Sequence, residues 1–145
     1  MAKTKQKNIG INVPAPKQTC TDINCPFHGT LNVRGRQFTG TVLSSKMSKT
    51  ATIEFERLYF IKKYERYEKR RTRLKVHSPE CIGAKEGDVV LIAECRPLSK
   101  TKNFTIIQKL GAEKGFIEKM SARESSKVPV KEKTLAPAAA EEEKK

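Results

Sequence analysis

Residues 87–103 read GDVVLIAECRPLSKTKN, and this stretch constrains the fold more than any other. Val89–Ala93 is a short apolar run directly after a Gly-Asp turn signal, which predicts a buried strand. We expect Arg96 and Pro97 to end its ladder, because proline has no N–H to donate. Residues 98–103 then alternate hydroxyl and cationic side chains, which can contact phosphate and ribose oxygens. The stretch therefore predicts a strand that presents a loop suited to a nucleic-acid backbone.

Four further segments have the alternation or the β-forming composition of strands. Residues 62–73 have the Glu and Lys content of a helix, but Tyr64 and Tyr67 give no 3.6-residue stripe, so the far end of a hairpin is favoured. Gly40 lies inside the first strand and indicates a bulge or sharp bend that lets a small sheet curl. The pattern predicts an all-β, five-stranded barrel of the oligonucleotide-binding (OB) type. The predicted strands are 37–44, 50–61, the return half of the hairpin ending at 74–77, 89–94 and 104–110.

The segments on either side of this predicted barrel differ from it in composition. Residues 1–33 are expected to form an N-terminal arm, extended at its start because Pro14 and Pro16 stand among polar neighbours. The barrel is expected over 34–110. Residues 111–145 turn polar and rich in Ala, Glu and Lys, which predicts a short helix at 112–123 followed by a disordered tail.

The charge balance favours a polyanionic partner. Lys and Arg total 30 against 16 Asp and Glu, a net charge of +14, with 37% hydrophobic residues. The cations are gathered in patches, with eight of them in residues 62–75 and a net negative charge over 76–95. We expect no membrane span, because no apolar run approaches 18 residues, and no secretory signal, because no apolar segment follows the basic start.

The basic residues fall into four groups, of which the hairpin end is the strongest candidate for contact with RNA. Its cations repel one another unless a polyanion is present, and Tyr64 and Tyr67 can stack on bases; the alternative is a solvated charged loop. A polar hairpin turn around 46–50 and two surface arginines beside Gly35 have similarly plain alternatives. The predicted RNA-binding residues are Arg34, Arg36, Lys46, Lys49, Lys62, Lys63, Arg66, Lys69, Arg70, Arg71, Arg73, Lys75, Arg96, Ser99, Lys100, Thr101 and Lys102.

Cys20, Cys25 and His28 have a spacing that can wrap one tetrahedral zinc ion. A structural site needs a fourth ligand, for which Cys81 in a separate loop is preferred over His77 and Cys95. The alternative is a set of reduced thiols without metal. Residues 1–34 hold few apolar side chains, so we expect the arm to dock by a structural zinc rather than by burial alone.

The stretch GDVVLIAECRPLSKTK, together with GTVLSSKMSKT at 40–50, resembles the signature of the small-subunit ribosomal protein family numbered seventeen in the universal scheme. Residues 64–71 and 75–77 also fit, and CTDINCPFHG at 20–29 is similar to the archaeal and eukaryotic branch. The resemblance implies an OB-type barrel that binds the 5′ domain of the small-subunit ribosomal RNA early in assembly. Its long hairpin and its last loop would reach between RNA helices.

The predicted function is therefore that of a structural, RNA-binding constituent of the small ribosomal subunit in the cytoplasm. Its partners would be ribosomal RNA and neighbouring ribosomal proteins, without a membrane or a second copy of the chain. An enzyme is not expected, because the sequence has no phosphate-binding glycine loop and no deaminase zinc motif. The alternative is a free OB-fold protein for single-stranded nucleic acid. Such a protein needs stacking aromatics, and this chain has no Trp and 6% aromatic residues.

Overall fold

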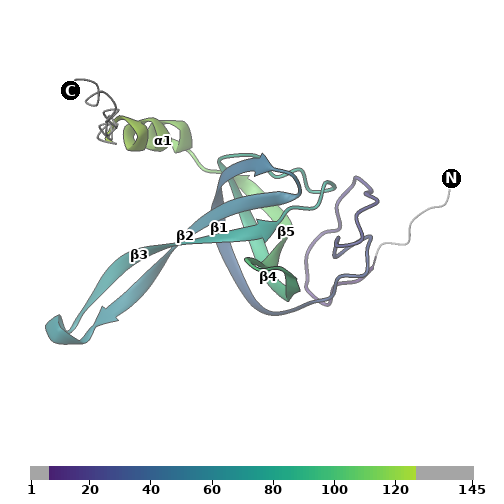
Figure 1. Cartoon of the computed structure of the whole chain (residues 1–145), viewed down its shortest axis with the longest axis horizontal. Helices are drawn as coiled ribbons and strands as arrows, with labels where there is room; N and C mark the ends of the chain where they lie inside the picture. The colour runs from purple at the N-terminus through teal and green to yellow at the C-terminus, as the bar shows by residue number, and fades with distance from the viewer. Residues whose placement is uncertain (1–6, 127–145) are drawn as a thin grey trace, which may run out of the picture. The chain divides into compact units, whose positions relative to one another are not determined.

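The computed structural model describes residues 7–126, so the start of the arm and the predicted tail from residue 127 on lie outside the described residues. Within this range, the alternating segments form strands that lie around a common interior (Figure 1). The elements are β1 (Val33–Met47), β2 (Thr50–Ile61), a short 3-10 turn η1 (Lys62–Tyr64), β3 (Arg66–His77), β4 (Asp88–Ser99), β5 (Lys102–Ala112) and α1 (Phe116–Ser125).

The five strands pair into one sheet that closes in a ring, in the order β1-β2-β3-β5-β4. β1 closes the ring because it pairs antiparallel with β2 on one side and with β4 on the other. β2 with β3 and β4 with β5 form antiparallel hairpins, and β3 meets β5 in a short parallel pairing. The prediction of five strands in one closing sheet is confirmed, and the described chain is mostly β and not all-β, because it also contains α1.

The interior of the ring is filled by one fully buried aliphatic side chain or more from every strand. Examples, in strand order, are Val42, Ile53, Val76, Val90 and Ile106. Each burial of this size stabilises the fold by about 1.5–3 kcal/mol. On β2, Ala51 is buried as well as Ile53.

Gly40 lets β1 approach β2 closely, and the bulges of β1 against β2 lie further along the strand than predicted. A Cβ atom at Gly40 would lie 2.7 Å from Ile53 Cγ2 and 2.8 Å from the Glu54 carbonyl oxygen, so no side chain fits. The register shifts of β1 against β2 come later, on both sides of Ser44. The strand therefore bends beyond the glycine that the sequence singles out.

β1, β4 and β5 are longer than predicted, and the predicted stop at Pro97 is wrong. β4 continues to Ser99 because its ladder with β5 changes register between Glu94 and Ser99, which accommodates a residue without an N–H. Ser99 then pairs with Lys102 across a tight turn, instead of opening the predicted loop over 98–103.

The predicted helix at 112–123 begins later, at Phe116, because β5 still pairs with β4 at Ala112. The chain divides into two compact units, one up to Lys114 and one from Gly115. In the second unit, α1 leaves Ile117 largely exposed. No helix within residues 7–126 is long and apolar enough to cross a membrane.

Candidate nucleic-acid interface and metal cluster

The hairpin of β2 and β3 extends well beyond the ring (Figure 1). Its strands pair without interruption from Thr50 opposite His77 to Ile61 opposite Arg66. Near the ring several side chains are buried, but residues 56–60 in β2 and 66–71 in β3 are exposed. We call this outer part, residues 55–72 with its turn, the ribbon. The predicted hairpin end at 62–73 is confirmed, with only η1 helical.

The predicted cations of the hairpin all lie exposed on the ribbon or at its base, from Lys62 to Lys75. Sequence reasoning missed Arg57, which pairs directly opposite Arg70 in the ladder. Like charges in directly opposed positions destabilise a hairpin. The register of the hairpin could have revealed Arg57, because the position of the turn determines that residue 57 pairs with residue 70.

Two of these cations have carboxylate partners within the chain. Arg70 Nε lies 2.9 Å from Glu68 Oε2 on the exposed ribbon, where such a pair contributes about 0–1 kcal/mol. Arg73 Nε lies 2.9 Å from Glu54 Oε2, and Glu54 is buried in the wall of the ring. Arg73 is therefore tied to the ring, whereas Arg70 is easily released to another anion.

Two predicted basic loops lie side by side at the other end of β2. The Lys102 ammonium donates a hydrogen bond to Thr50 Oγ1 at 3.0 Å, which joins the β4–β5 turn to the β1–β2 turn. Lys49 Nζ lies 3.8 Å from Asp22 Oδ1 and 3.7 Å from Glu80 Oε1. Lys46, Lys100 and Thr101 are exposed beside these anchored lysines.

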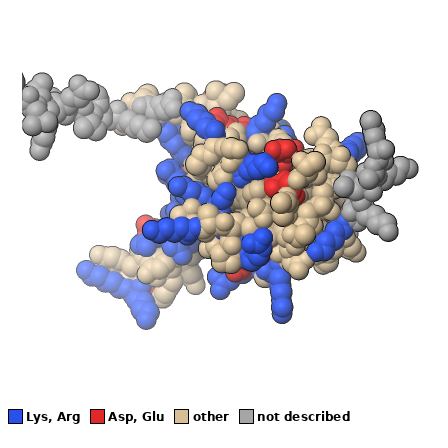
Figure 2. Space-filling model, turned by 45° about the vertical axis from the view of Figure 1, so that its right-hand side comes forward, with Lys and Arg blue, Asp and Glu red and all other residues tan. Residues whose placement is uncertain are grey.

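Arg34 and Arg36 lie in β1 and not in a turn. The Arg36 backbone N–H donates to Glu94 Oε2 at 3.1 Å. Gly35 has φ +109° and brings its Cα against that carboxylate, where a Cβ would lie 2.8 Å from the oxygen. Arg96 Nη2 donates to Asn24 Oδ1 at 3.3 Å. Figure 2 shows Lys and Arg side chains spread over much of the visible face, with few Asp and Glu among them.

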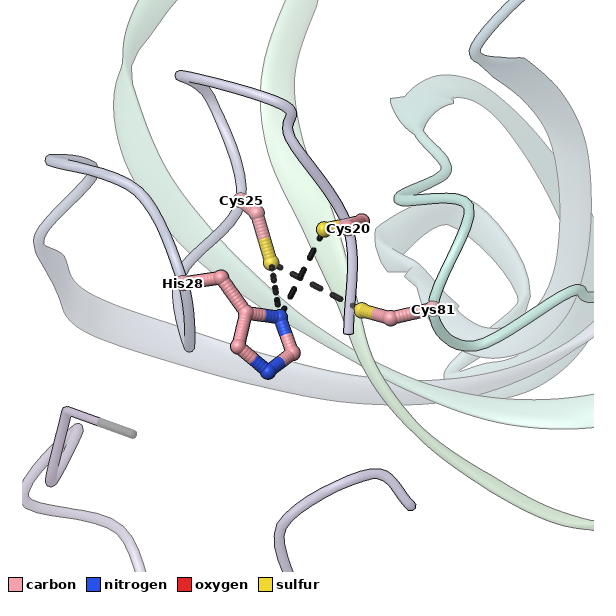
Figure 3. Close-up of side chains that lie close together, drawn as sticks. All are labelled: Cys20, Cys25, His28 and Cys81. Carbon is pink, nitrogen blue, oxygen red and sulfur yellow. Dashed lines mark hydrogen bonds between the residues drawn. The ribbon is translucent and has the colours of Figure 1, made fainter. Parts of the chain in front are cut away.

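Four predicted metal ligands meet at one point beside the ring, and their side chains point toward one another (Figure 3). Cys20, Cys25 and His28 come from the arm, and Cys81 comes from the loop between β3 and β4. All four ligand atoms lie within 4.8 Å of one another. These residues form a Cys3His cluster that can hold a metal ion.

The spacing of the ligand atoms in the Cys3His cluster matches that of a tetrahedral zinc site. Cys25 Sγ lies 3.6 Å from Cys81 Sγ and 3.6 Å from His28 Nδ1, and Cys20 Sγ lies 3.5 Å from the same nitrogen. For zinc–sulfur bonds of about 2.3 Å, the edge of a tetrahedron is about 3.8 Å. The donor set of three sulfurs and one imidazole is also one that zinc prefers.

The contact between the Cys25 and Cys81 thiols shifts their pKa values in opposite directions. The hydrogen bond from the Cys81 thiol lowers the pKa of Cys25 to about 4, and the same contact raises the pKa of Cys81. Burial raises the pKa of Cys20. A thiolate at Cys25 is the form that binds a metal ion.

The loop that carries three of these ligands is shaped by local hydrogen bonds. The Cys25 N–H donates to the Asp22 carbonyl, and the Gly29 N–H donates to the Cys25 carbonyl. Gly29 has no room for a Cβ, which would lie 2.2 Å from the Ile23 carbonyl oxygen. The tight turn therefore needs a glycine directly after His28.

A buried pair beside the Cys3His cluster escaped sequence reasoning. His77 Nε2 lies 2.9 Å from Asp22 Oδ2, and both side chains are buried. His77, considered as a fourth ligand, instead bonds this carboxylate. Cys95, the other alternative, is buried but is absent from the group of ligand atoms that lie together in the described chain. No short-range signal marks the pair, because its residues lie 55 positions apart.

The arm docks with more apolar burial than the sequence indicated. Cys25, Phe27 and Leu31 are almost completely buried, and Phe27 packs in a cluster with Ala93 and Ile107. The sequence shows only isolated apolar residues here, because they are separated by polar turn residues. The arm is thus held by apolar burial as well as by the groups around the Cys3His cluster.

Comparison with known proteins identifies the family. The family model for ribosomal protein S17 matches residues 40–108, which includes most of the ring and the whole ribbon. A small ribosomal subunit protein uS17 of Methanoculleus marisnigri is 58% identical over 102 residues, which are 70% of this chain and 94% of that protein. The chain belongs to the ribosomal protein S17 family. Membership makes it a structural protein of the small ribosomal subunit, in the cytoplasm, and not an enzyme.

Other S17 relatives, also archaeal, agree with the predicted archaeal and eukaryotic branch. Proteins named uS17 from Methanocaldococcus jannaschii and Methanopyrus kandleri are 56% and 54% identical, over 105 and 104 residues. These matches cover 72% of this chain and 90% and 88% of the relatives. As an S17 protein, the chain has ribosomal RNA and other ribosomal proteins as its implied partners.

Proposed function

We propose that the protein binds ribosomal RNA directly, through the ribbon and through the basic turns near Thr50. The observation that carries the proposal is the exposed ribbon, on which basic side chains outnumber carboxylates. Arg57 lies directly opposite Arg70, and the two cations share one nearby carboxylate partner, Glu68 on Arg70, so a bound phosphate would offset the remaining repulsion. Phosphate contacts of this kind position a protein on RNA. They are the contacts that we propose for the predicted RNA-binding residues, from Arg34 to Lys102.

We further propose that the ring is an OB-type barrel spanning residues 34–110, with the arm and the residues after 110 as its extensions. The strand order β1-β2-β3-β5-β4 and the parallel contact between β3 and β5 support this proposal. In this account the barrel is a rigid support that binds the 5′ domain of the small-subunit RNA early in assembly. The ribbon would then fix the angle between RNA helices, without a second copy of the chain or a membrane.

The test is the affinity of the full-length protein for a transcript of that 5′ domain, measured over 50–200 mM salt. Six to ten phosphate contacts would weaken binding by roughly 10³ to 10⁵ across this range. A transcript of equal length from another RNA is the control. Equal affinity for both transcripts, or binding that ignores salt, would contradict the proposal.

We also propose that the Cys3His cluster holds one structural zinc ion. The ion would tie the arm to the loop that carries Cys81, and so to the end of β3. The tetrahedral spacing of the four ligand atoms supports this assignment. His28 would bind the ion through Nδ1, because this nitrogen lies 3.5 Å from Cys20 Sγ and 3.6 Å from Cys25 Sγ.

The test for zinc is the metal content of the purified protein, with Cys81→Ser and the matched control Cys95→Ser. Cys95 is buried like Cys81 but lies outside the Cys3His cluster. We expect one zinc ion per chain in the wild type and in Cys95→Ser, and none in Cys81→Ser. A folded wild-type protein without metal would refute the zinc assignment but not RNA binding.

A further inference from the structure

The end of the ribbon carries an apolar and aromatic patch that is open to solvent. Leu58, Phe60 and Tyr67 have exposed fractions of 66%, 44% and 69%. Phe60 and Tyr67 are directly opposed in the ladder, with ring centroids 5.1 Å apart and planes at 54°. Two exposed rings beside an exposed Leu are unfavourable in water, so a contiguous patch of this kind indicates a binding surface.

The aromatic rings on the two faces of the ribbon contact different side chains. Directly opposed residues share a face, and neighbouring pairs alternate between the faces. Tyr59, opposite Glu68, lies on the face away from Phe60 and Tyr67. The Arg70 guanidinium lies 4.0 Å from the centroid of the Tyr59 ring, and Glu68 holds that guanidinium at 2.9 Å. The chain's own arginine therefore stacks on the Tyr59 ring, although Tyr59 is 43% exposed, close to Phe60. On the opposite face, Phe60 and Tyr67 contact each other, and Tyr67 is the most exposed of the three rings.

The charges around the open face indicate what covers it. Lys69 is opposite Leu58 and Arg71 is opposite Glu56, so two cations and one carboxylate share this face with the rings. Residues 56–71 as a whole have an excess of cations, which favours a polyanion over an ordinary protein surface. The basic residues are Arg57, Lys62, Lys63, Arg66, Lys69, Arg70 and Arg71, and the acidic ones are Glu56, Glu65 and Glu68.

We propose that Phe60 and Tyr67 receive an unpaired RNA base, which stacks on their rings while Lys69 and Arg71 contact the adjoining phosphates. The inference rests on the RNA binding proposed above and adds a base contact to it. Bases inside a duplex are already stacked, so the ligand is a nucleotide of a loop or bulge that can be splayed out. Every base has a face that stacks, so this contact adds affinity without requiring one base identity.

The first test compares the double variant Phe60→Leu with Tyr67→Leu against the wild type, using the full-length protein and the 5′-domain transcript. Leucines keep the apolar character but remove the rings, so we expect binding about tenfold to hundredfold weaker. The slope of log affinity against log salt should not change, because no cation is lost. A thermal melt should also be unchanged, since both side chains are exposed at the ribbon end.

Two matched controls separate stacking from other effects. The exchange Phe60→Tyr with Tyr67→Phe keeps both rings and should bind like the wild type. Tyr59→Leu removes a ring from the opposite face and should bind within about twofold of the wild type, because the Arg70 guanidinium already stacks on that ring. Weakening by Tyr59→Leu equal to that of the double variant would overturn the assignment to one face.

Ultraviolet cross-linking of the wild-type complex locates the base contact directly. Trypsin cleaves the ribbon at its Lys and Arg residues, which gives separate peptides for residues 58–62, 64–66 and 67–69. We expect a nucleotide mass on 58–62 and 67–69, and none on 64–66, which carries Tyr64 at the turn.

The outcomes distinguish this inference from the RNA binding on which it rests. If the wild type binds with the expected salt slope and the leucine variant binds equally well, the base contact is wrong and RNA binding stands. If the leucine variant binds RNA normally but fails to join small subunits, the patch contacts another protein. That outcome also overturns the inference. If the wild type does not bind the transcript, both proposals fall.

Discussion

The arm and the ribbon differ in what stabilises them: the arm packs against the ring, whereas the ribbon is exposed to solvent. The arm, residues 7–32, buries Phe27 and Leu31 against the ring, and it carries three ligands of the Cys3His cluster. The ribbon has exposed side chains on both faces and concentrates like charges. A two-stranded hairpin alone is marginally stable in water. From this comparison, we expect the protein itself to hold the arm in place, and we expect the proposed RNA contact to stabilise the ribbon.

The largest expected effect comes from removing the proposed zinc ion. A strong chelator should lower the free energy of unfolding of the wild type by several kcal/mol, because metal binding to such a site is coupled to folding. The measurement is urea unfolding with and without chelator. Cys81→Ser should unfold equally with and without chelator, and an equal insensitivity of the wild type would show that the arm needs no metal.

The second effect compares the same substitution in the two regions. Phe27→Ala should destabilise the protein by about 3–5 kcal/mol, because Phe27 is almost completely buried between the arm and the ring. Phe60→Ala, at an exposed ribbon position, should leave the free energy of unfolding within about 0.5 kcal/mol of the wild type. Similar losses from both variants, measured by urea unfolding, would remove the contrast between the regions.

Charge reversal in the ribbon should act on RNA binding and not on stability. Arg70→Glu with Arg71→Glu should weaken binding by about 1.5–3 kcal/mol for each charged hydrogen bond lost. The thermal melt should stay in place, since both residues are exposed and the Arg70–Glu68 pair is a surface pair. Affinity and melt are measured on the same preparations. A collapsed melt would mean that the ribbon supports the ring.

The smallest expected effect is a difference in the salt dependence of RNA binding between two lysine variants, Lys100→Ala and Lys102→Ala. Lys100→Ala should lower the slope of log affinity against log salt by about 1, as expected for one phosphate contact. Lys102→Ala should lower it less, because the Lys102 ammonium also bonds Thr50, and it should cost about 0.5–1.5 kcal/mol of stability. Equal slopes and equal melts for the two variants would mean that the bond to Thr50 does not distinguish them.

The features that sequence reasoning could find are those with a local period or spacing. The bounds 50–61 for β2 follow from its alternation, and the structure gives the same strand. The choice of Cys81 to join Cys20, Cys25 and His28 rests on its position in a loop, and the four side chains do come together. Whether these residues bind zinc, and which cations contact RNA, stay predictions.

The features that sequence reasoning missed depend on partners distant in the chain. β4 passes through Pro97 because β5 changes register beside it, which no local rule anticipates. The pair of Asp22 with His77 needs the arm to be folded against β3. Phe27 looks isolated among turn residues, and its burial is set by Ala93 and Ile107 from β4 and β5.

Amide hydrogen exchange of the zinc-loaded protein, free and bound to the 5′-domain transcript, tests the contrast between the two regions most directly. In the free protein, we expect residues 20–31 of the arm to exchange slowly and residues 55–72 of the ribbon to exchange fast. On binding RNA, the ribbon should become strongly protected and the arm should change little. A ribbon that is already as protected in the free protein as in the complex would contradict the account.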